Sequence, residues 1–259
     1  MSTARDLPEL INTTFGGDLN GGEADEATLT ASCILAPLNE DVDGVNDLAA
    51  DMFKPRHREG DGERRGRQPA SSREYLSFDS VDPADDHGAH MNPPDFLNDL
   101  RPSGLPAHRL LIKPGMPVII VRNLNVRRGL CNGTRAIVLE ARRYTLLLRV
   151  MSGPLAGETY VLPRITLTHN ADERLSVTFS RKQFPIKLAF ALTINKAQGQ
   201  TLRRVAVYLP TPVFSHGQMY TAVSRAGDPD GLRVHALGSR NPVDGHVYTR
   251  NIVWEEALA

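Results

Sequence analysis

The order of elements in this chain is set by the stretch FALTINKAQGQTL at residues 190–202. An apolar run ends in a polar turn that carries Lys196 and Gly199, and a second apolar run follows at residues 205–209. This pattern predicts a buried strand, then a solvent-facing turn or helix start, then another strand. Ligands of open α/β sheets bind outside the carboxyl ends of the strands, so we expect residues 193–201 to face a ligand.

The composition is typical of a soluble globular protein. The 259 residues suffice for one large or two ordinary domains, and 41% of them are hydrophobic and 23% charged. Cys33 and Cys131 form neither a disulfide framework nor a metal-ligand spacing, which favours reduced thiols inside the cell. No apolar run approaches the roughly 18 residues of a spanning helix, so we expect no membrane partner.

The net charge of zero hides an asymmetry along the chain. Residues 1–100 hold 21 Asp/Glu against eight Lys/Arg, and residues 101–259 hold nine against 22, so the halves carry −13 and +13. Seven bases and no acid lie between Leu175 and Gly227, namely Arg181, Lys182, Lys187, Lys196, Arg203, Arg204 and Arg225. Such a segment is the footprint of a polyanion partner, or a solvated face that pairs with the acidic first hundred residues.

The first hundred residues give half of a βαβ element. Residues 1–28 indicate a linker with a short helix around residues 7–12. An apolar strand at residues 32–36 precedes a helical pattern in which Asn39 is the expected N-cap.

The loops of this half offer two weaker functional hypotheses. Residues 54–73 indicate a flexible loop whose Arg64, Arg65 and Arg67 are an alternative nucleic-acid contact. A strand is expected at residues 75–81 and a short helix at residues 94–100. In the loop between them, His87 and His90 beside two aspartates are an alternative metal site against a solvated loop.

Short strands with turns replace this pattern between Leu105 and His169. Four of them, expected at residues 117–121, 135–139, 144–150 and 157–162, predict a small barrel. The βα alternation then returns, with strands at residues 188–192, 205–209 and 231–237 and a helix at residues 216–225. The fold class is therefore α/β, a parallel-sheet lobe interrupted by a small β-barrel insertion.

The residues at the strand end suit phosphate chemistry. Thr193, Asn195 and Lys196 offer a hydroxyl, an amide and a cation, which are groups that bind phosphodiester oxygens. Gly199 permits close approach to the backbone, and Gln198 is placed to orient a phosphate or a water.

Arg225 ends a helix that we expect to face the same end of the sheet. There it would either stabilise a transferring phosphoryl group or serve the helix dipole.

Five segments in order resemble the Pif1-like superfamily 1 DNA helicases. Residues 193–202 look like their motif V and residues 214–225 like motif VI. Residues 34–42 are similar to the element that opens the second RecA-like lobe. Residues 103–118 and 128–135 resemble the inserted SH3-like 2B domain. The combination is most similar to the helicases carried by Helitron transposons.

The resemblance implies a role for each matched residue. Thr193, Asn195, Lys196 and Asn39 would touch the backbone of single-stranded DNA, although the family often has His where Asn195 stands. The resemblance also places three residues at the nucleotide's terminal phosphate: Gln198, Gly199 and, as the arginine finger, Arg225.

The resemblance also implies a domain plan. It gives a linker at 1–28, the first part of lobe 2A at 29–104, the SH3-like insertion at 105–175, the second part of lobe 2A at 176–238 and a tail at 239–259.

One motif set of the family is missing from the sequence. No Gly-x-x-x-x-Gly-Lys-Ser/Thr loop and no apolar strand ending in Asp-Glu occur, so the phosphate cradle and the metal-holding acid are not supplied. The full-length family uses ATP and Mg²⁺, and we expect this chain alone to bind neither. The expected partners are single-stranded DNA and a missing N-terminal RecA-like lobe.

Three hypotheses on function follow. The chain is part of an ATP-dependent 5′-to-3′ DNA helicase that serves repair and recombination, inactive without the first lobe. Alternatively, it is a stand-alone single-strand-binding module, or a transposon remnant. The expected location is the nucleus, with mitochondria or cytoplasm as alternatives.

Overall fold

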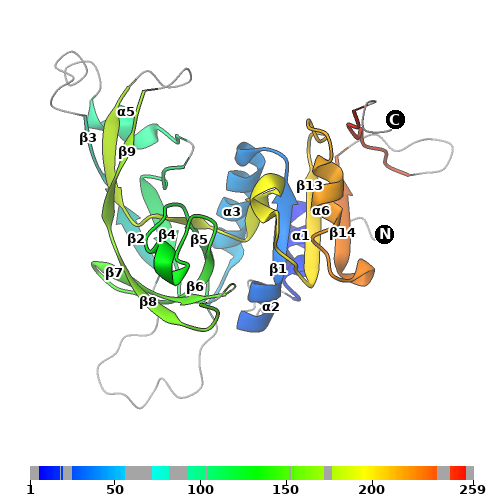
Figure 1. The fold of residues 1–259 in the computed structure, drawn as a ribbon, viewed down its shortest axis with the longest axis horizontal. Coiled ribbons are helices and arrows are strands. Elements are labelled where there is room, and N and C mark those ends of the chain that lie inside the picture. Colours follow the sequence, from blue (N-terminus) through cyan, green and yellow to red (C-terminus); the bar gives the residue numbers. More distant parts are fainter. Residues whose placement is uncertain are drawn as a thin grey trace. The chain divides into compact units, whose positions relative to one another are not determined.

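The computed structural model describes residues 6–17, 19, 25–55, 72–81, 93–102, 104–151, 153, 155–171, 177–237 and 246–254. The chain divides into two compact units (Figure 1). Residues 1–57 and 188–259 form the first, called here the parallel-sheet unit, and residues 58–187 form the second, the β unit. The β unit thus extends on both sides of the expected insertion at 105–175.

The parallel-sheet unit has one four-stranded sheet in the order β12-β1-β13-β14, with every neighbouring pair parallel. Its strands are β1 (Ser32–Ala36), β12 (Ala191–Thr193), β13 (Arg204–Leu209) and β14 (Leu232–Ala236). Its helices are α1 (Leu7–Thr14), α2 (Glu26–Ala31), α3 (Asn39–Met52) and α6 (Gln218–Val223), with 3-10 turns η2 (Ile194–Ala197) and η3 (Pro229–Gly231). All five residues of β1 are buried, as expected for a parallel strand covered on both faces.

The first helix belongs to the core of this unit. Asp6 caps α1 by accepting from the backbone N–H of Glu9 at 2.8 Å, and Leu10 and Ile11 are fully buried. Phe15, which follows the helix, packs edge-on against Phe190 with ring centroids 5.5 Å apart. Residues 7–15 therefore pack in the core, where the sequence indicated mainly a linker.

The start of α3 differs from the prediction by one residue. The N-cap is Leu38, in extended backbone geometry, and Asn39 is the first helical residue, so the prediction of Asn39 as N-cap is wrong. The backbone N–H of Leu38 donates to the carboxylate of Asp41 instead. This bond is the reciprocal half of a capping box, in which the side chain of the third helical residue accepts from the N-cap N–H.

The β unit contains three sheets, in the orders β11-β5-β6-β7-β8, β3-β10-β9 and β2-β4. The pairs from β5 to β8 and all pairs of the two smaller sheets are antiparallel. Their strands are β2 (Arg73–Leu76), β3 (Phe78–Val81), β4 (Arg109–Ile112), β5 (Pro117–Ile120), β6 (Arg135–Ala141), β7 (Thr145–Val150), β8 (Thr159–Pro163), β9 (Ile165–His169), β10 (Phe179–Gln183) and β11 (Ile186–Leu188). Helix α5 (Pro94–Asp99) and the 3-10 turn η1 (Val126–Arg128) complete the unit.

Two predicted strands are each divided in the structure. The run at residues 75–81 forms β2 and β3, which pair with different partners, β4 and β10. The break falls at Ser77, whose N–H donates to the carbonyl of His108. The run at residues 188–192 ends β11 in the β unit and begins β12 at Ala191, because the chain passes from one unit to the other here.

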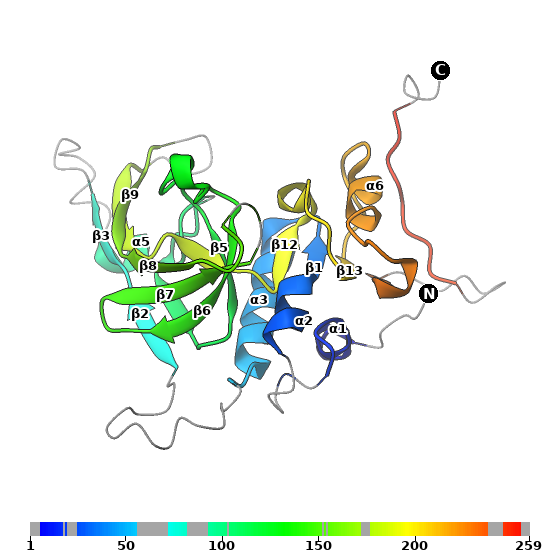
Figure 2. The ribbon, with the colours of Figure 1, turned by 60° about the horizontal axis from the view of Figure 1, so that its bottom comes forward.

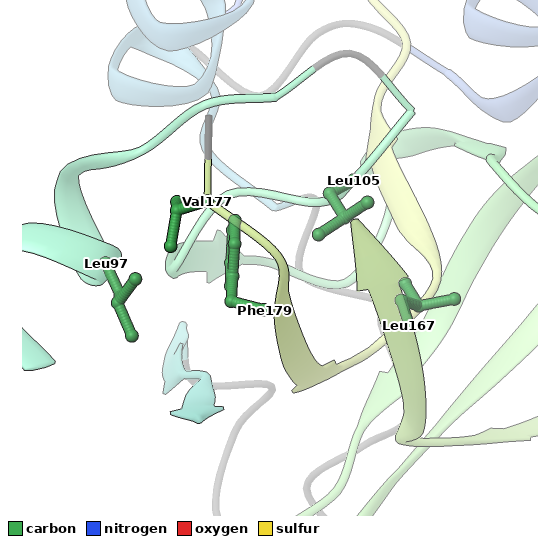
Figure 3. Close-up of a cluster of buried hydrophobic side chains, with 5 residues drawn as sticks. All are labelled: Leu97, Leu105, Leu167, Val177 and Phe179. Carbon is green, nitrogen blue, oxygen red and sulfur yellow. The ribbon is translucent and has the colours of Figure 1, made fainter. Parts of the chain in front are cut away.

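A small apolar cluster holds α5 against β9 and β10 (Figure 3). It consists of Leu97, Leu105, Leu167, Val177 and Phe179. Beside it, the guanidinium of Arg181 is fully buried and forms an ion pair with Asp79 at 2.7 Å. The same guanidinium donates to three backbone carbonyls, those of Leu97, Leu100 and Pro106.

Candidate nucleic-acid interface

The carboxyl edge of the parallel sheet brings two predicted contact segments together. Ala36 at the end of β1 pairs with Thr193 at the end of β12, so the chain leaves both strands at neighbouring points of this edge. Asn39 follows β1 after two residues and is exposed. Thr193 is half-buried and its hydroxyl does not cap η2. Asn39 and Thr193 therefore lie on the same edge, as the sequence predicts.

The turn η2 presents its two polar residues to solvent. Ile194 and Ala197 are fully buried and anchor the turn, whereas Asn195 and Lys196 are exposed. The turn ends at Gln198, whose N–H donates to the carbonyl of Asn195 at 3.4 Å. An amide and an ammonium group thus stand beyond the end of β12, where a phosphodiester would meet both.

The polar turn after η2 is built around Gly199. Gly199 has a φ of 78°, a conformation that favours glycine, and a Cβ placed there would meet no atom within 4 Å. Gln198 and Gly199 are both exposed. Gln200 folds back, and its side-chain amide donates to the carbonyl of Lys196 at 3.3 Å. The backbone here is open to a ligand on its outer side.

The segment 194–203 then crosses the sheet. Because β12 and β13 are both parallel to β1, the chain must return from the carboxyl edge to the amino edge before β13 begins at Arg204. Near the end of this return, Leu202 N–H donates to the carbonyl of Arg225 at 2.9 Å, and Gly227 N–H donates to the carbonyl of Leu202 at 2.9 Å. The motif V-like and motif VI-like segments are thus joined by their backbones.

The guanidinium of Arg225 makes the same connection through its side chain. Its Nη1 donates to the carbonyl of Gln200 at 3.1 Å, its Nε to the carbonyl of Thr221 at 3.0 Å, and its Nη2 to Ser224 Oγ at 2.9 Å. A guanidinium has five N–H donors, so two are left after these three bonds. Arg225 is half-buried and lies beside Gln200, on the return path.

The position of Arg225 corrects one expectation. Helix α6 follows the carboxyl end of β13 and runs back along the sheet, beginning after Gly217, whose φ of 69° lets the chain turn into it (Figure 1). Arg225, just after its last turn, bonds to Gln200 and Leu202 on the way to the amino edge. Its backbone thus lies toward the amino edge, whereas its guanidinium lies beside Gln200, whose side chain bonds to Lys196 of η2.

Asn46 is a positioning residue that the sequence pattern did not single out. It is buried on α3, and its side-chain amide accepts from the N–H of Ala191 at 2.9 Å and donates to the carbonyl of Ala191 at 3.1 Å. Since β12 is the edge strand of the sheet, these two bonds replace those of a missing neighbour strand. The only available signal was a polar residue among Val42, Val45 and Ala49 on the apolar face of the helix.

An acidic group also lies near the carboxyl edge. Burial raises the pKa of the Asp41 carboxyl, the Leu38 N–H lowers it, and the neighbouring charge of Glu40 raises it. The pKa of Tyr208, near the end of β13, is raised by burial and then by the charge of Asp41. The charge of Asp41 therefore acts as far as Tyr208 of β13.

Not every base of the acid-free segment belongs to a polyanion surface. Arg181 is fully buried, and its donors are used by Asp79 and three carbonyls, so its charge is compensated inside the β unit. Of the seven bases, Lys182, Lys196 and Arg203 are exposed. The sequence overstated the footprint because it cannot distinguish a buried, paired arginine from a solvated one.

Two alternatives of the sequence analysis fall outside the described residues, namely the arginines 64, 65 and 67 and the histidines 87 and 90. Within the described ranges, no group of three or more His, Cys, Asp or Glu side chains is placed to hold a metal ion. No described helix has the length and apolar character needed to cross a membrane.

A family model and several curated proteins match this chain. The model of the 2B domain of the DNA helicase Pif1 matches residues 95–140. The ATP-dependent DNA helicase PIF1 of Danio rerio is 42% identical over 131 residues, which is 50% of this chain and 20% of that protein. The human protein of the same name is 41% identical over 133 residues, again 50% of this chain and 20% of its own length.

Solved structures share the fold. Pif1 from Bacteroides, crystallised with ADP-AlF3 and single-stranded DNA, has a TM-score of 0.56 and 20% identity, covering 97% of this chain and 48% of that one. Pif1 from Candida albicans has a TM-score of 0.53 and 24% identity, covering 93% and 55%. At this identity, the likeness shows the fold alone.

This chain spans about a fifth of the curated relatives named above and about half of the solved ones. The 2B match, the two curated relatives and the shared fold agree with one another. Taken together, they relate this chain to the Pif1-like superfamily 1 DNA helicases and match it to their C-terminal region.

Proposed function

We propose that this chain binds single-stranded DNA along the carboxyl edge of its parallel sheet, as part of a Pif1-like motor. One observation carries the proposal: exposed Asn195 and Lys196 follow β12 directly, beside the exposed Asn39 that follows β1. Neutral and cationic donors at neighbouring strand ends suit a phosphate backbone without reading its bases.

The return segment gives this edge a connection to a second site. Residues 194–203 run from the carboxyl edge to Leu202, which is bonded to Arg225. We infer that a shift of the strand-binding turn is passed along this segment to Arg225. Its two remaining N–H donors would serve the terminal phosphate of a nucleotide held mainly by another lobe, with Gln198 and Gly199 exposed nearby.

The residues of this chain do not make a complete nucleotide site. Gly199 and Arg225 suit a phosphate, but the sequence has neither a glycine-rich cradle with its lysine nor the acid that holds Mg²⁺. ATP-dependent 5′-to-3′ unwinding is therefore proposed only for an assembly that also contains a first RecA-like lobe. Within it, the β unit would be the SH3-like 2B domain that braces the strand.

The second candidate function is a stand-alone single-strand-binding module. The basic half of the chain favours it, because charge neutralisation alone supports nonspecific binding. Both candidates use the same edge, and they differ only in the need for a nucleotide-binding lobe.

Titration of a fluorescein-labelled dT12 into the 259-residue chain at several salt concentrations tests the proposal. We expect micromolar-range binding that weakens with salt. We expect Lys196→Ala to weaken it and to reduce the slope of log affinity against log salt by about 1. The matched control is Lys54→Ala, an exposed lysine just beyond the opposite end of α3, which should change neither quantity.

Two results would count against the proposed edge. One is the absence of salt-sensitive binding by the unmodified chain. The other is equal weakening by Lys196→Ala and Lys54→Ala, because a diffuse charge effect would not distinguish the two ends of the sheet.

A further inference from the structure

The segment 246–254 returns to the start of α6. The backbone N–H of Trp254 donates to Nδ1 of His216 at 3.0 Å, and the two rings stack with centroids 5.1 Å apart and planes 20° apart. Figure 2 shows this segment, in red, running beside α6. A bond and a stack at the same pair of residues fix the position of the indole.

This anchoring places Trp254 near the carboxyl edge. His216 lies in the connection that follows the carboxyl end of β13, before α6 begins. Strands β13 and β12 are both neighbours of β1, so their ends are about 10 Å apart at the usual strand spacing. The polar turn after β12 and the anchored indole thus belong to one edge of one sheet.

The segment displays aromatic and basic side chains instead of burying them. Trp254 is 61% exposed although one face of its ring is covered by His216, and Tyr248 is 65% exposed. Arg250, between them, is also exposed. Phe214, two residues before His216, is a further exposed ring in the same area. An ordered Trp at the surface leaves a ring face free for a planar partner.

The charge along this surface is mixed. Residues 210–226 and 246–254 contain no acid, with Arg225 and Arg250 as their bases, whereas Glu255 and Glu256 follow Trp254 in the sequence. Interleaved aromatic and basic side chains are the pattern by which single-strand-binding surfaces stack bases and neutralise phosphates.

We propose that residues 246–254 form a second contact for single-stranded nucleic acid, in which Trp254 and Tyr248 stack on bases and Arg250 binds the backbone. This contact extends the proposed strand-binding edge from η2 toward α6, and it rests on the function proposed above. It adds base stacking to an edge whose other candidate residues offer only phosphate contacts.

Trp254 is the single tryptophan of the chain, so its intrinsic fluorescence reports this contact alone. We expect dT12 to quench Trp254 emission. An abasic 12-mer with the same phosphates should bind by charge without the quench. Trp254→Leu should weaken dT12 binding about 5- to 150-fold, the range for loss of one stacked base. His216→Leu should weaken it less, by releasing the anchor.

The matched control is Val253→Ala, since Val253 is an exposed apolar residue of the same segment that has no ring to stack on a base, and it should leave dT12 binding nearly unchanged. If dT12 binds with salt sensitivity but Trp254 emission does not change and Trp254→Leu binds equally well, this inference is wrong and the proposed function stands. An equal quench by the abasic oligomer also contradicts stacking. If no oligonucleotide binds, both proposals fail.

Discussion

Asp41 shows how much of the local chemistry depends on one side chain. Its carboxylate accepts from the Leu38 N–H at the start of α3, and its Oδ2 is buried without a hydrogen-bond partner among the described residues. The first oxygen stabilises the helix start, whereas the second has lost water without compensation. The same side chain therefore helps the helix and opposes the ionised state.

We expect Asp41→Asn to stabilise the protein at neutral pH. Burial raises the pKa of Asp41 above its ordinary value of 3.8, so the ionised form is disfavoured in the folded chain. Its stabilising contribution is complete below pH 3.8 and is lost as the pH rises through the raised pKa. Asparagine keeps the acceptor for Leu38 and removes the charge.

Chemical denaturation at a series of pH values measures this difference. The variant should be more stable than the unmodified chain at pH 7, and the difference should close as the pH falls toward 3.8. Asp41→Ala, which also removes the acceptor, should gain less. A variant Asp41→Asn that is less stable at pH 7 would show that the carboxylate is favourable where it stands.

Arg181 shows a different effect of burial, on the stability of the β unit. Arg181→Met leaves the buried carboxylate of Asp79 without its cation and three carbonyls without a donor. We expect it to destabilise the β unit by about 3–5 kcal/mol, the usual cost of breaking a buried pair from one side. The loss should be nearly the same at low and high salt because the pair is shielded from solvent.

Lys182→Met is the matched control for Arg181→Met, since Lys182 is the next residue of the same strand and its side chain is exposed. Its stability should change by less than about 0.5 kcal/mol. Equal destabilisation by the two variants would mean that the ion pair with Asp79 is not what holds this part of the β unit.

At the scale of elements, the predictable parts are those whose sequence pattern is local. β1 is observed at the predicted residues because Cys33 to Ala36 is a continuous apolar run ended by Pro37. The division at residues 188–192 was not predictable, because both sides are apolar and only the tertiary fold decides which sheet each joins. The packing of α1 was likewise missed, since Leu10, Ile11 and Phe15 are few apolar residues in a polar context.

The edge strand β12 depends on α3 for its second row of hydrogen bonds. Asn46→Leu removes both bonds to Ala191. It leaves the backbone N–H and C=O of Ala191 buried beside an apolar side chain. We expect a loss of about 2–6 kcal/mol in stability, at roughly 1–3 kcal/mol for each of the two unpaired buried groups. Since Thr193 and η2 follow this strand, dT12 binding should also weaken.

Asn46→Asp separates the two bonds at Asn46. Aspartate keeps an acceptor for the Ala191 N–H but offers no donor to its carbonyl when ionised, so it should lose stability at neutral pH and recover part of it in acid. Stability and dT12 affinity, measured on the same variants, should fall together. An Asn46→Leu protein of unchanged stability would mean that β12 needs no support at its open side.

At the scale of the whole molecule, some features of the candidate site could be predicted from the sequence and others are visible only in the structure. The shared position of Thr193, Asn195, Lys196 and Asn39 was predictable because parallel strands end at one edge, and their contact with DNA stays a prediction. The separation of the Arg225 backbone from that edge was not predictable, because it depends on the direction of α6. Trp254 could not be selected from a weakly patterned tail without the contact to His216.

The contacts of Arg225 and the missing phosphate cradle lead to a prediction about catalysis. Arg225 is held by Gln200, Thr221 and Ser224, and the sequence supplies no phosphate cradle for it to act on. We therefore expect the 259-residue chain to show negligible ATP hydrolysis, with or without dT12, in a coupled phosphate-release assay. Arg225→Ala should not change this baseline. It should also leave dT12 binding intact, because the Arg225 backbone lies toward the amino edge.

Measurable turnover that Arg225→Ala abolishes would mean that this chain holds a nucleotide through residues other than a P-loop. The coupling segment from Lys196 to Leu202 would then operate within the chain and not between two lobes.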